Sequence, residues 1–165
     1  MKLIFGLVAL LLLPGCQHDP HAHRYTTEKP SVSDIVGKYE LAHIYIESHA
    51  PGIGEKVKQL PSPPTIYIYS DGRFSASNFP YFSEIRQGFE YRFEDFRSLD
   101  TTWALAVVGS IDNGLGNIED LQGIHLADQP GYPSSLRFTG TKKVDGLILG
   151  FGDPDIGDAI IFRKK

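Results

Sequence analysis

Residues 66–77 read Ile-Tyr-Ile-Tyr-Ser-Asp-Gly-Arg-Phe-Ser-Ala-Ser, and they give the clearest indication of the fold class. A short run of β-branched and aromatic residues begins at Ile66, and a second short run begins at Phe74. Asp71 and Gly72 lie between the two runs, and a glycine at such a place accepts the positive φ that a tight hairpin turn requires. The stretch therefore predicts two antiparallel strands joined by a turn.

The same strand signals recur along the rest of the chain. Phe89, Tyr91 and Phe93 alternate with polar residues, which is the period-2 pattern of a strand with one apolar face. Further strands are expected at residues 38–46, 102–108, 123–127, 134–139, 147–151 and 159–163. Many short consecutive strands favour an all-β domain. We expect an antiparallel up-and-down barrel of about eight strands, with a β-sandwich as the alternative. A barrel has the advantage that closure removes exposed sheet edges.

The N-terminus has the pattern of an export signal. Lys2 is followed by an apolar run that ends at Leu13, shorter than the about 20 residues that a membrane-spanning helix needs. The run leads into Leu13-Pro14-Gly15-Cys16, which resembles the lipobox of bacterial lipoproteins. The resemblance implies cleavage before Cys16, attachment of fatty acids such as palmitate to that cysteine, and a membrane-anchored protein of the cell envelope. Gln17, standing where Asp would retain the protein in the inner membrane, implies the outer membrane and a domain facing the periplasm.

These features divide the chain into a signal peptide (1–15), a flexible lipidated tether (16–33) and a single β domain (34–165). The tether is polar and aperiodic, and a coil of roughly 17 residues spans on average about 20–25 Å. It would hold the domain clear of the lipid headgroups. Cys16 is the one cysteine of the chain, so the domain is expected to fold without an internal disulfide.

The charge of the chain argues against nucleic acid as a partner. Lys2 is the one charged residue of the signal peptide, so the rest of the chain has 15 Lys and Arg against 20 Asp and Glu, a formal charge of −5. A basic run occurs only at the last three residues, 163–165. Binding to a phosphate backbone requires a basic surface, which this composition does not predict.

Residues 34–41, Asp-Ile-Val-Gly-Lys-Tyr-Glu-Leu, resemble the start of lipocalin-like domains, where a Gly-x-aromatic step leads into the first strand. Tyr39 stands where that family has Trp. Residues 152–162 resemble the final hairpin of small uncharacterised envelope lipoproteins. The lipocalin resemblance implies a barrel that holds a small apolar ligand in its mouth. Such a cavity would be lined by aromatic residues, and the candidates are Tyr91, Phe93, Trp103 and Phe138.

A protein-interaction module is the hypothesis that the sequence favours, because nothing in it marks a particular ligand. Such a module would dock another envelope protein, for example as an inhibitor or an immunity-type blocker of a toxin. The candidate partner-binding residues are Asn78, Phe79, Tyr81 and Phe82, where a proline lowers the ordering cost and aromatic rings supply anchors. The long connections at residues 49–64 and 109–122 would serve the same purpose.

Metal binding and catalysis have the least support. The chain has no Gly-x-Ser-x-Gly elbow, no phosphate-binding glycine loop and no zinc-type cysteine pair. Weak candidate metal ligands are His18, His21, His23, His43, Glu47 and His49. The first three lie on the tether, so binding would have to order a mobile segment. We therefore expect no tight metal site, no cofactor and no catalytic residue.

In the first expected strand, apolar and polar residues that should face opposite sides of the sheet fall on the same side. Tyr39 and Leu41 have the same parity as the polar residues His43 and Glu47, although the first two are candidates for the core. Both groups can be placed correctly if the strand changes its inward face near Ala42, as a β-bulge would allow.

Overall fold

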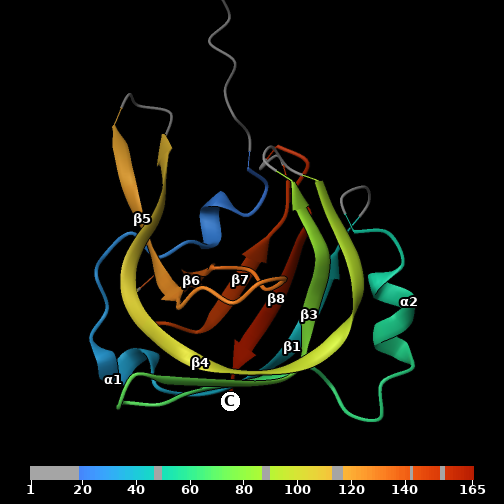
Figure 1. Ribbon diagram of the computed structural model, residues 1–165. Helices are drawn as coiled ribbons and strands as arrows, with labels where there is room; N and C mark the ends of the chain where they lie inside the picture. Colours follow the sequence, from blue (N-terminus) through green and yellow to red (C-terminus); the bar gives the residue numbers. More distant parts are fainter. Residues whose placement is uncertain (1–18, 47–49, 87–89, 113–116, 142, 153–154) are drawn as a thin grey trace, which may run out of the picture.

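The computed structural model describes residues 19–46, 50–86, 90–112, 117–141, 143–152 and 155–165 (Figure 1). Eight antiparallel strands follow one another around a single sheet, and β1 pairs with β8 to close it into a barrel. This confirms the up-and-down barrel and excludes the two-sheet sandwich. The strands are β1 (Gly37–Tyr45), β2 (Thr65–Ile68), β3 (Arg73–Arg86), β4 (Glu90–Asp112), β5 (Ile118–Leu126), β6 (Ser135–Thr139), β7 (Gly146–Gly150) and β8 (Ala159–Lys164).

The hairpin predicted at residues 66–77 is present. Ile68 pairs with Phe74 across β2 and β3, and Gly72 in the turn has a φ of 86°. β4 is longer than the sequence indicates, because the strand expected around Phe93 and the strand expected at 102–108 are one continuous element. Figure 1 shows β4 curving around the barrel; its first part pairs with β3 and its second part pairs with β5.

The β-bulge predicted near Ala42 is also present. The register between β1 and β8 shifts between Leu41 and His43, so one residue of β1 is left without a partner. Tyr39 is fully buried before the bulge, whereas His43 and Tyr45 are exposed after it. The bulge thus lets one strand place its apolar residues inside the barrel on both sides of Ala42.

Large side chains fill the barrel. Among the side chains that the structure describes, five aromatic residues have no exposed surface; they are Tyr39, Phe79, Phe82, Phe138 and Phe162. Several of these rings pack edge to face or stacked, for example Phe74 on Phe79 with centroids 5.8 Å apart. The interior is therefore a packed core.

The connection at residues 49–64 holds a short helix, α2 (Ile53–Lys58), which the sequence analysis did not predict. Ile53 is buried, and Val57 and Leu60 pack against the same core. Ile53 and Val57 are four residues apart, which places their side chains on one face of the helix, and this signal was available in the sequence. A second short helix, α1 (Val32–Ile35), precedes β1 and begins with a capping box between Ser31 and Asp34.

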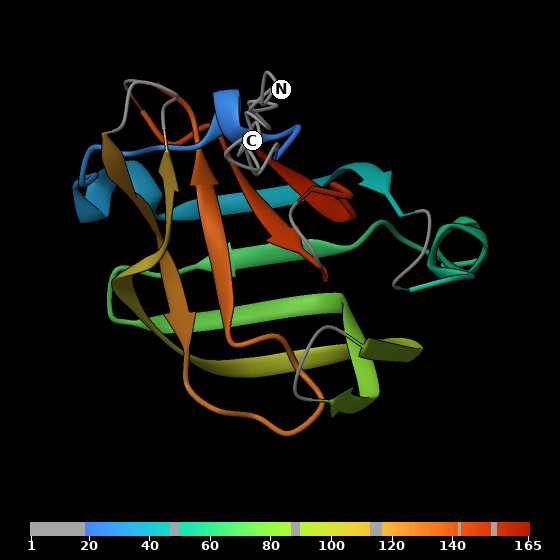
Figure 2. The same ribbon diagram turned by 90° about the horizontal axis from the view of Figure 1, so that it is seen from above.

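The largest difference between expectation and structure is in the segment that was expected to be a flexible tether. From Asp19 onward the chain lies against the barrel, and residues 19–26, which include the 3-10 turn η1 (Ala22–Arg24), form what we call the N-terminal strap. Figure 2 shows this segment crossing one side of the barrel. The free linker predicted for residues 16–33 is therefore wrong for the strap, and the folded unit begins before residue 34.

Two kinds of contact hold the strap. Its Tyr25 ring is buried in an apolar cluster on the outside of the barrel, with Leu121, Ile148, Ala159 and Ile161. Its backbone also bonds to β5 and β6: Thr26 N donates to the Phe138 carbonyl (3.1 Å), and the Gln122 N–H donates to the Thr26 carbonyl (2.9 Å). Composition could not indicate this, because a polar sequence with a single aromatic residue gives no periodic signal.

Removal of the strap should therefore destabilise the barrel. We expect a variant without residues 17–26 to lose about 2–4 kcal/mol of unfolding free energy. The deletion exposes Ile148 and Ile161, and it removes the acceptor of the Gln122 amide on β5. Urea denaturation measures the difference against a variant that begins at Gln17, both made without Cys16. Equal stability of the two variants would show that the strap is not part of the folded unit.

Candidate functional site

The loop between β5 and β6, residues 127–134, crosses to β3 and is fixed there. The Phe82 N–H donates to the Gly131 carbonyl (2.8 Å), and the Tyr132 hydroxyl donates to the Ser98 carbonyl on β4 (3.0 Å). Gly131 has a φ of 82°, and a Cβ on it would lie 2.3 Å from the Tyr81 ring. Glycine is therefore required here for both its conformation and its lack of a side chain.

A cavity of about 560 Å³ lies beside this loop. Its apolar lining comes from Phe82 on β3, from Leu149 and Phe151 at the end of β7, and from the prolines of the loop. Its polar lining comes from Ser83, Asp128, Gln129, Ser134 and Ser135. The cavity has the size of a small-ligand pocket, and it lies at the edge of the packed core, not within it.

Next to the cavity, three side chains from different elements form what we call the Tyr–Arg cluster. The guanidinium carbon of Arg97 lies 3.6 Å from the centroid of the Tyr81 ring, and the Tyr81 ring packs edge to face on Tyr132 with centroids 5.2 Å apart. Tyr81 and Tyr132 are half-buried, and Arg97 is exposed. Burial raises the pKa of the Tyr132 phenol, against the opposing effect of Arg97. The cluster presents a cation and two aromatic edges on a rigid base.

The structure separates the four predicted partner-binding residues. Phe79 and Phe82 are fully buried in the core, so their prediction as exposed anchors is wrong. Asn78 adopts a φ of 54° at a register shift in β3, and its side-chain amide donates to the Ser62 carbonyl (2.9 Å). Tyr81 alone is an accessible aromatic residue of this group. The bulges around it turn its neighbours inward, and the sequence pattern does not reveal those bulges.

The predicted ligand-lining residues do not line an open barrel. Phe138 is fully buried, and Trp103 is 9% exposed with its Nε1 donating to the Tyr69 carbonyl (3.0 Å). Phe93 packs edge to face on Phe82 and Phe96. The side chain of Tyr91 lies outside the described part. Three of the four residues thus serve the core, and the expectation of a hollow barrel at Phe138 is wrong.

The candidate metal ligands are scattered. His18, Glu47 and His49 lie outside the described residues. His23 and His43 are exposed, and His21 is buried. In the described part of the chain no group of three or more His, Cys, Asp or Glu side chains could hold a metal ion.

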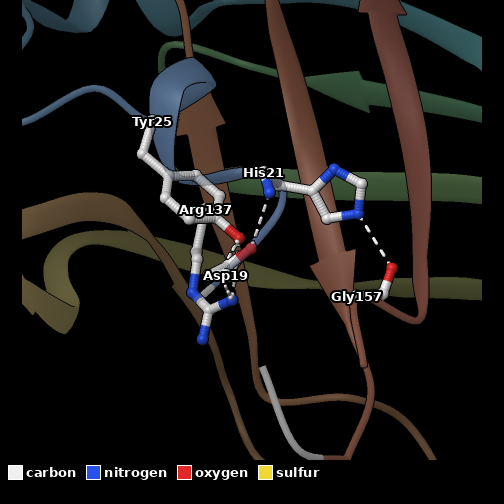
Figure 3. Close-up of polar contacts among 5 residues, drawn as sticks. All are labelled: Asp19, His21, Tyr25, Arg137 and Gly157. Atoms are coloured by element: carbon white, nitrogen blue, oxygen red, sulfur yellow. Dashed lines mark hydrogen bonds and ion pairs between the residues drawn. The ribbon is translucent and has the colours of Figure 1, made fainter. Parts of the chain in front are cut away.

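His21 belongs instead to a polar cluster that fastens the strap to the barrel (Figure 3). Its Nε2 donates to the Gly157 carbonyl (2.8 Å), and its backbone N–H donates to Asp19 Oδ1 (2.8 Å). The Tyr25 hydroxyl donates to Asp19 Oδ2 (2.7 Å) and receives a hydrogen bond from Arg137 of β6 (3.2 Å). Each member thus has a partner on the strap or on the barrel.

Burial raises the pKa of the Tyr25 phenol above its ordinary value, and the hydrogen bond to Asp19 acts in the same direction. Arg137 opposes this shift. The folded protein therefore favours the neutral form of the Tyr25 phenol.

Comparisons of this chain with protein-family models, with curated protein sequences and with solved structures find no significant match. None of the helices in the described ranges is long and apolar enough to cross a membrane.

The position of the loop at residues 127–134 can be tested through Gly131. We expect Gly131→Ala to lower the unfolding free energy by about 1–3 kcal/mol, because the new methyl group meets Tyr81 and the backbone is in the left-handed region. Gly54→Ala is the control, since a Cβ at that helical position meets nothing within 4 Å. It should be neutral or slightly stabilising. Equal effects in urea denaturation would contradict the loop placement.

The strap should make the unfolding free energy of the protein depend on pH. Because the pKa of Tyr25 is raised in the folded state, its contribution to stability is complete below pH 10 and falls as the pH rises above that value. Tyr25→Phe should cost about 1–2 kcal/mol at pH 7 through the lost hydrogen bonds. It should also flatten the alkaline loss of stability by up to about 1.4 kcal/mol per pH unit. Parallel denaturation profiles of the two proteins between pH 9 and about 12 would exclude this role.

Proposed function

We propose that this chain is a lipid-anchored envelope lipoprotein that binds another envelope protein through the Tyr–Arg cluster and the adjoining cavity. The observation that carries the proposal is the combination of a filled barrel with an accessible cavity at its edge. Recognition then takes place on the outside of the barrel. The proposal assigns no catalytic role to the chain.

The composition and rigidity of this surface suit protein recognition. Tyrosine and arginine are, with tryptophan, the residue types that most often dominate binding energy at protein interfaces. Tyr81 and Tyr132 are held by packing and by the hydrogen bond to Ser98, so little conformational freedom is lost when a partner binds. Arg97 adds a charged group that selects an acidic or carbonyl-rich contact, and the cavity can receive a side chain of the partner.

Binding of a small apolar ligand is the second candidate, and one observation favours it. The cavity volume of about 560 Å³ falls within the range of ligand pockets, and Phe82, Leu149 and Phe151 give it apolar walls. This ligand site would be at the edge of the barrel, in place of the central mouth that a lipocalin-like protein would use.

The membrane anchor rests on the Leu13-Pro14-Gly15-Cys16 motif. We expect mass spectrometry of the mature protein to find an N-terminal Cys16 that carries a diacylglycerol or triacyl modification. Cys16→Ser should accumulate as an unprocessed precursor. An unmodified N-terminus at any other residue would contradict the lipoprotein assignment.

The binding function is tested with matched tyrosine variants. Tyr67 is a solvent-exposed tyrosine with the Lys38 ammonium 5.9 Å from its ring, and it lies on β2, away from the Tyr–Arg cluster. Cross-linked partners from envelope extract should be lost with Tyr81→Ala or Arg97→Ala and kept with Tyr67→Ala. Native mass spectrometry of the same proteins reports any co-purified small molecule.

Two results would decide against protein binding. The first is a partner profile that is identical for Tyr81→Ala and Tyr67→Ala. The second is a stoichiometric apolar molecule in the natural protein, with no partner captured, which would support the second candidate. Circular dichroism of each variant confirms that it retains the strand signal.

A further inference from the structure

The strap fixes the start of the described chain on the barrel. The Asp19 carboxylate accepts hydrogen bonds from the His21 backbone and from the Tyr25 hydroxyl, and Arg137 Nη1 lies 4.0 Å from its Oδ2. The Asp19 side chain is only 11% exposed. Pro20 follows directly and packs so closely on Gly157 that a Cβ there would lie 2.4 Å from Pro20 Cγ. Asp19 therefore has a defined position on the surface of the barrel.

The distance between the lipid and this position is short. Cys16 is three residues before Asp19, and three residues of fully extended chain reach no more than about 11 Å. A free tether of about 17 residues would instead have allowed a mean span of about 20–25 Å. Because this step takes Cys16 as the lipidated residue, the inference rests on the proposed function.

The surface beside Asp19 has the composition of a membrane-contacting surface. Ile156 is 47% exposed and Tyr45 is 40% exposed, although both are large apolar residues. Arg24 lies next to them, with its guanidinium carbon 6.0 Å from the centroid of the Tyr45 ring, and Pro20 is exposed. Together with His21, Ile44 and Asp158, these residues line a surface hollow of about 470 Å³. Tyrosine, an aliphatic side chain and a cation are the groups that favour the headgroup region of a bilayer.

We propose that the short link from Cys16 holds the surface formed by Pro20, Arg24, Tyr45 and Ile156 against the lipid headgroups. We call this surface the lipid-facing surface. The occupant is the membrane in which the protein's own acyl chains are inserted. The barrel then has a fixed orientation, with the strap side toward the lipid and β3 on the side that Figure 2 shows away from the strap.

The test uses the single cysteine of the chain. Once Cys16 carries lipid, the thiol introduced by Ile156→Cys is the one available for labelling with a small fluorophore. The labelled lipoprotein is inserted into vesicles of phosphatidylethanolamine and phosphatidylglycerol that contain a lipid with a quencher near its headgroup. Ser77→Cys, an exposed position on β3, is the matched control.

We expect the label at residue 156 to be quenched at least about twofold more strongly than the label at residue 77, because quenching requires approach to within the interfacial layer. Equal quenching at the two positions would overturn the inference. A Gly-Ser insertion of about 12 residues between His18 and Asp19 adds about 20 Å of mean reach. It should reduce quenching at residue 156 to the control level, and quenching that stays high would show that the short link is not what holds the surface.

The two proposals fail in different ways. If mass spectrometry finds no lipid on Cys16, the lipoprotein assignment fails and the inference fails with it. If the lipid is present and both labels are quenched equally, the lipoprotein assignment stands and the lipid-facing surface is wrong. Thermal denaturation of each labelled variant verifies that the barrel is folded.

Discussion

The backbone pairing between β1 and β8 closes the sheet in a protein whose sequence contains no second cysteine to form a disulfide. Closure removes free strand edges. In β1, the bulge at Ala42 allows apolar residues on both sides of the register shift to face the interior. It also points Tyr45 outward, where its ring meets His21 of the strap with centroids 5.3 Å apart. The closure of the barrel and the position of the strap are thus linked through one strand.

The strap covers apolar residues on the outer face of β7 and β8. Ile148 and Ile161 face outward there, and without a cover they would form an exposed apolar patch. The ring of Tyr25 covers them, while the polar cluster around Asp19 satisfies the polar groups that this burial takes from water. A segment that serves the stability of the barrel in this way would also limit the distance between the barrel and a lipid on Cys16 in the lipoprotein that we propose. In that proposal, stability and orientation at the membrane have the same structural origin.

Local sequence patterns were sufficient to predict part of the structure. The turn at Asp71 and Gly72 and the bulge at Ala42 follow from φ preference and from side-chain parity, which act over a few residues. The strap and the Tyr–Arg cluster depend on contacts between distant parts of the chain. Tyr25 meets Ile148, and Tyr81 meets Tyr132, only after the barrel has formed. The sequence pattern also could not predict that Phe79 and Phe82 are buried, because bulges in β3 determine which aromatic residues face inward.

Amide hydrogen exchange of the protein can show whether the strap belongs to the folded unit. The amide of Thr26 donates to Phe138, and the amide of Gln122 donates to Thr26, so both report on the strap. We expect these two amides to exchange as slowly as the amides of β7, such as that of Ile148. Exchange of the Thr26 and Gln122 amides at the rate of an unstructured peptide, with β7 still protected, would contradict it.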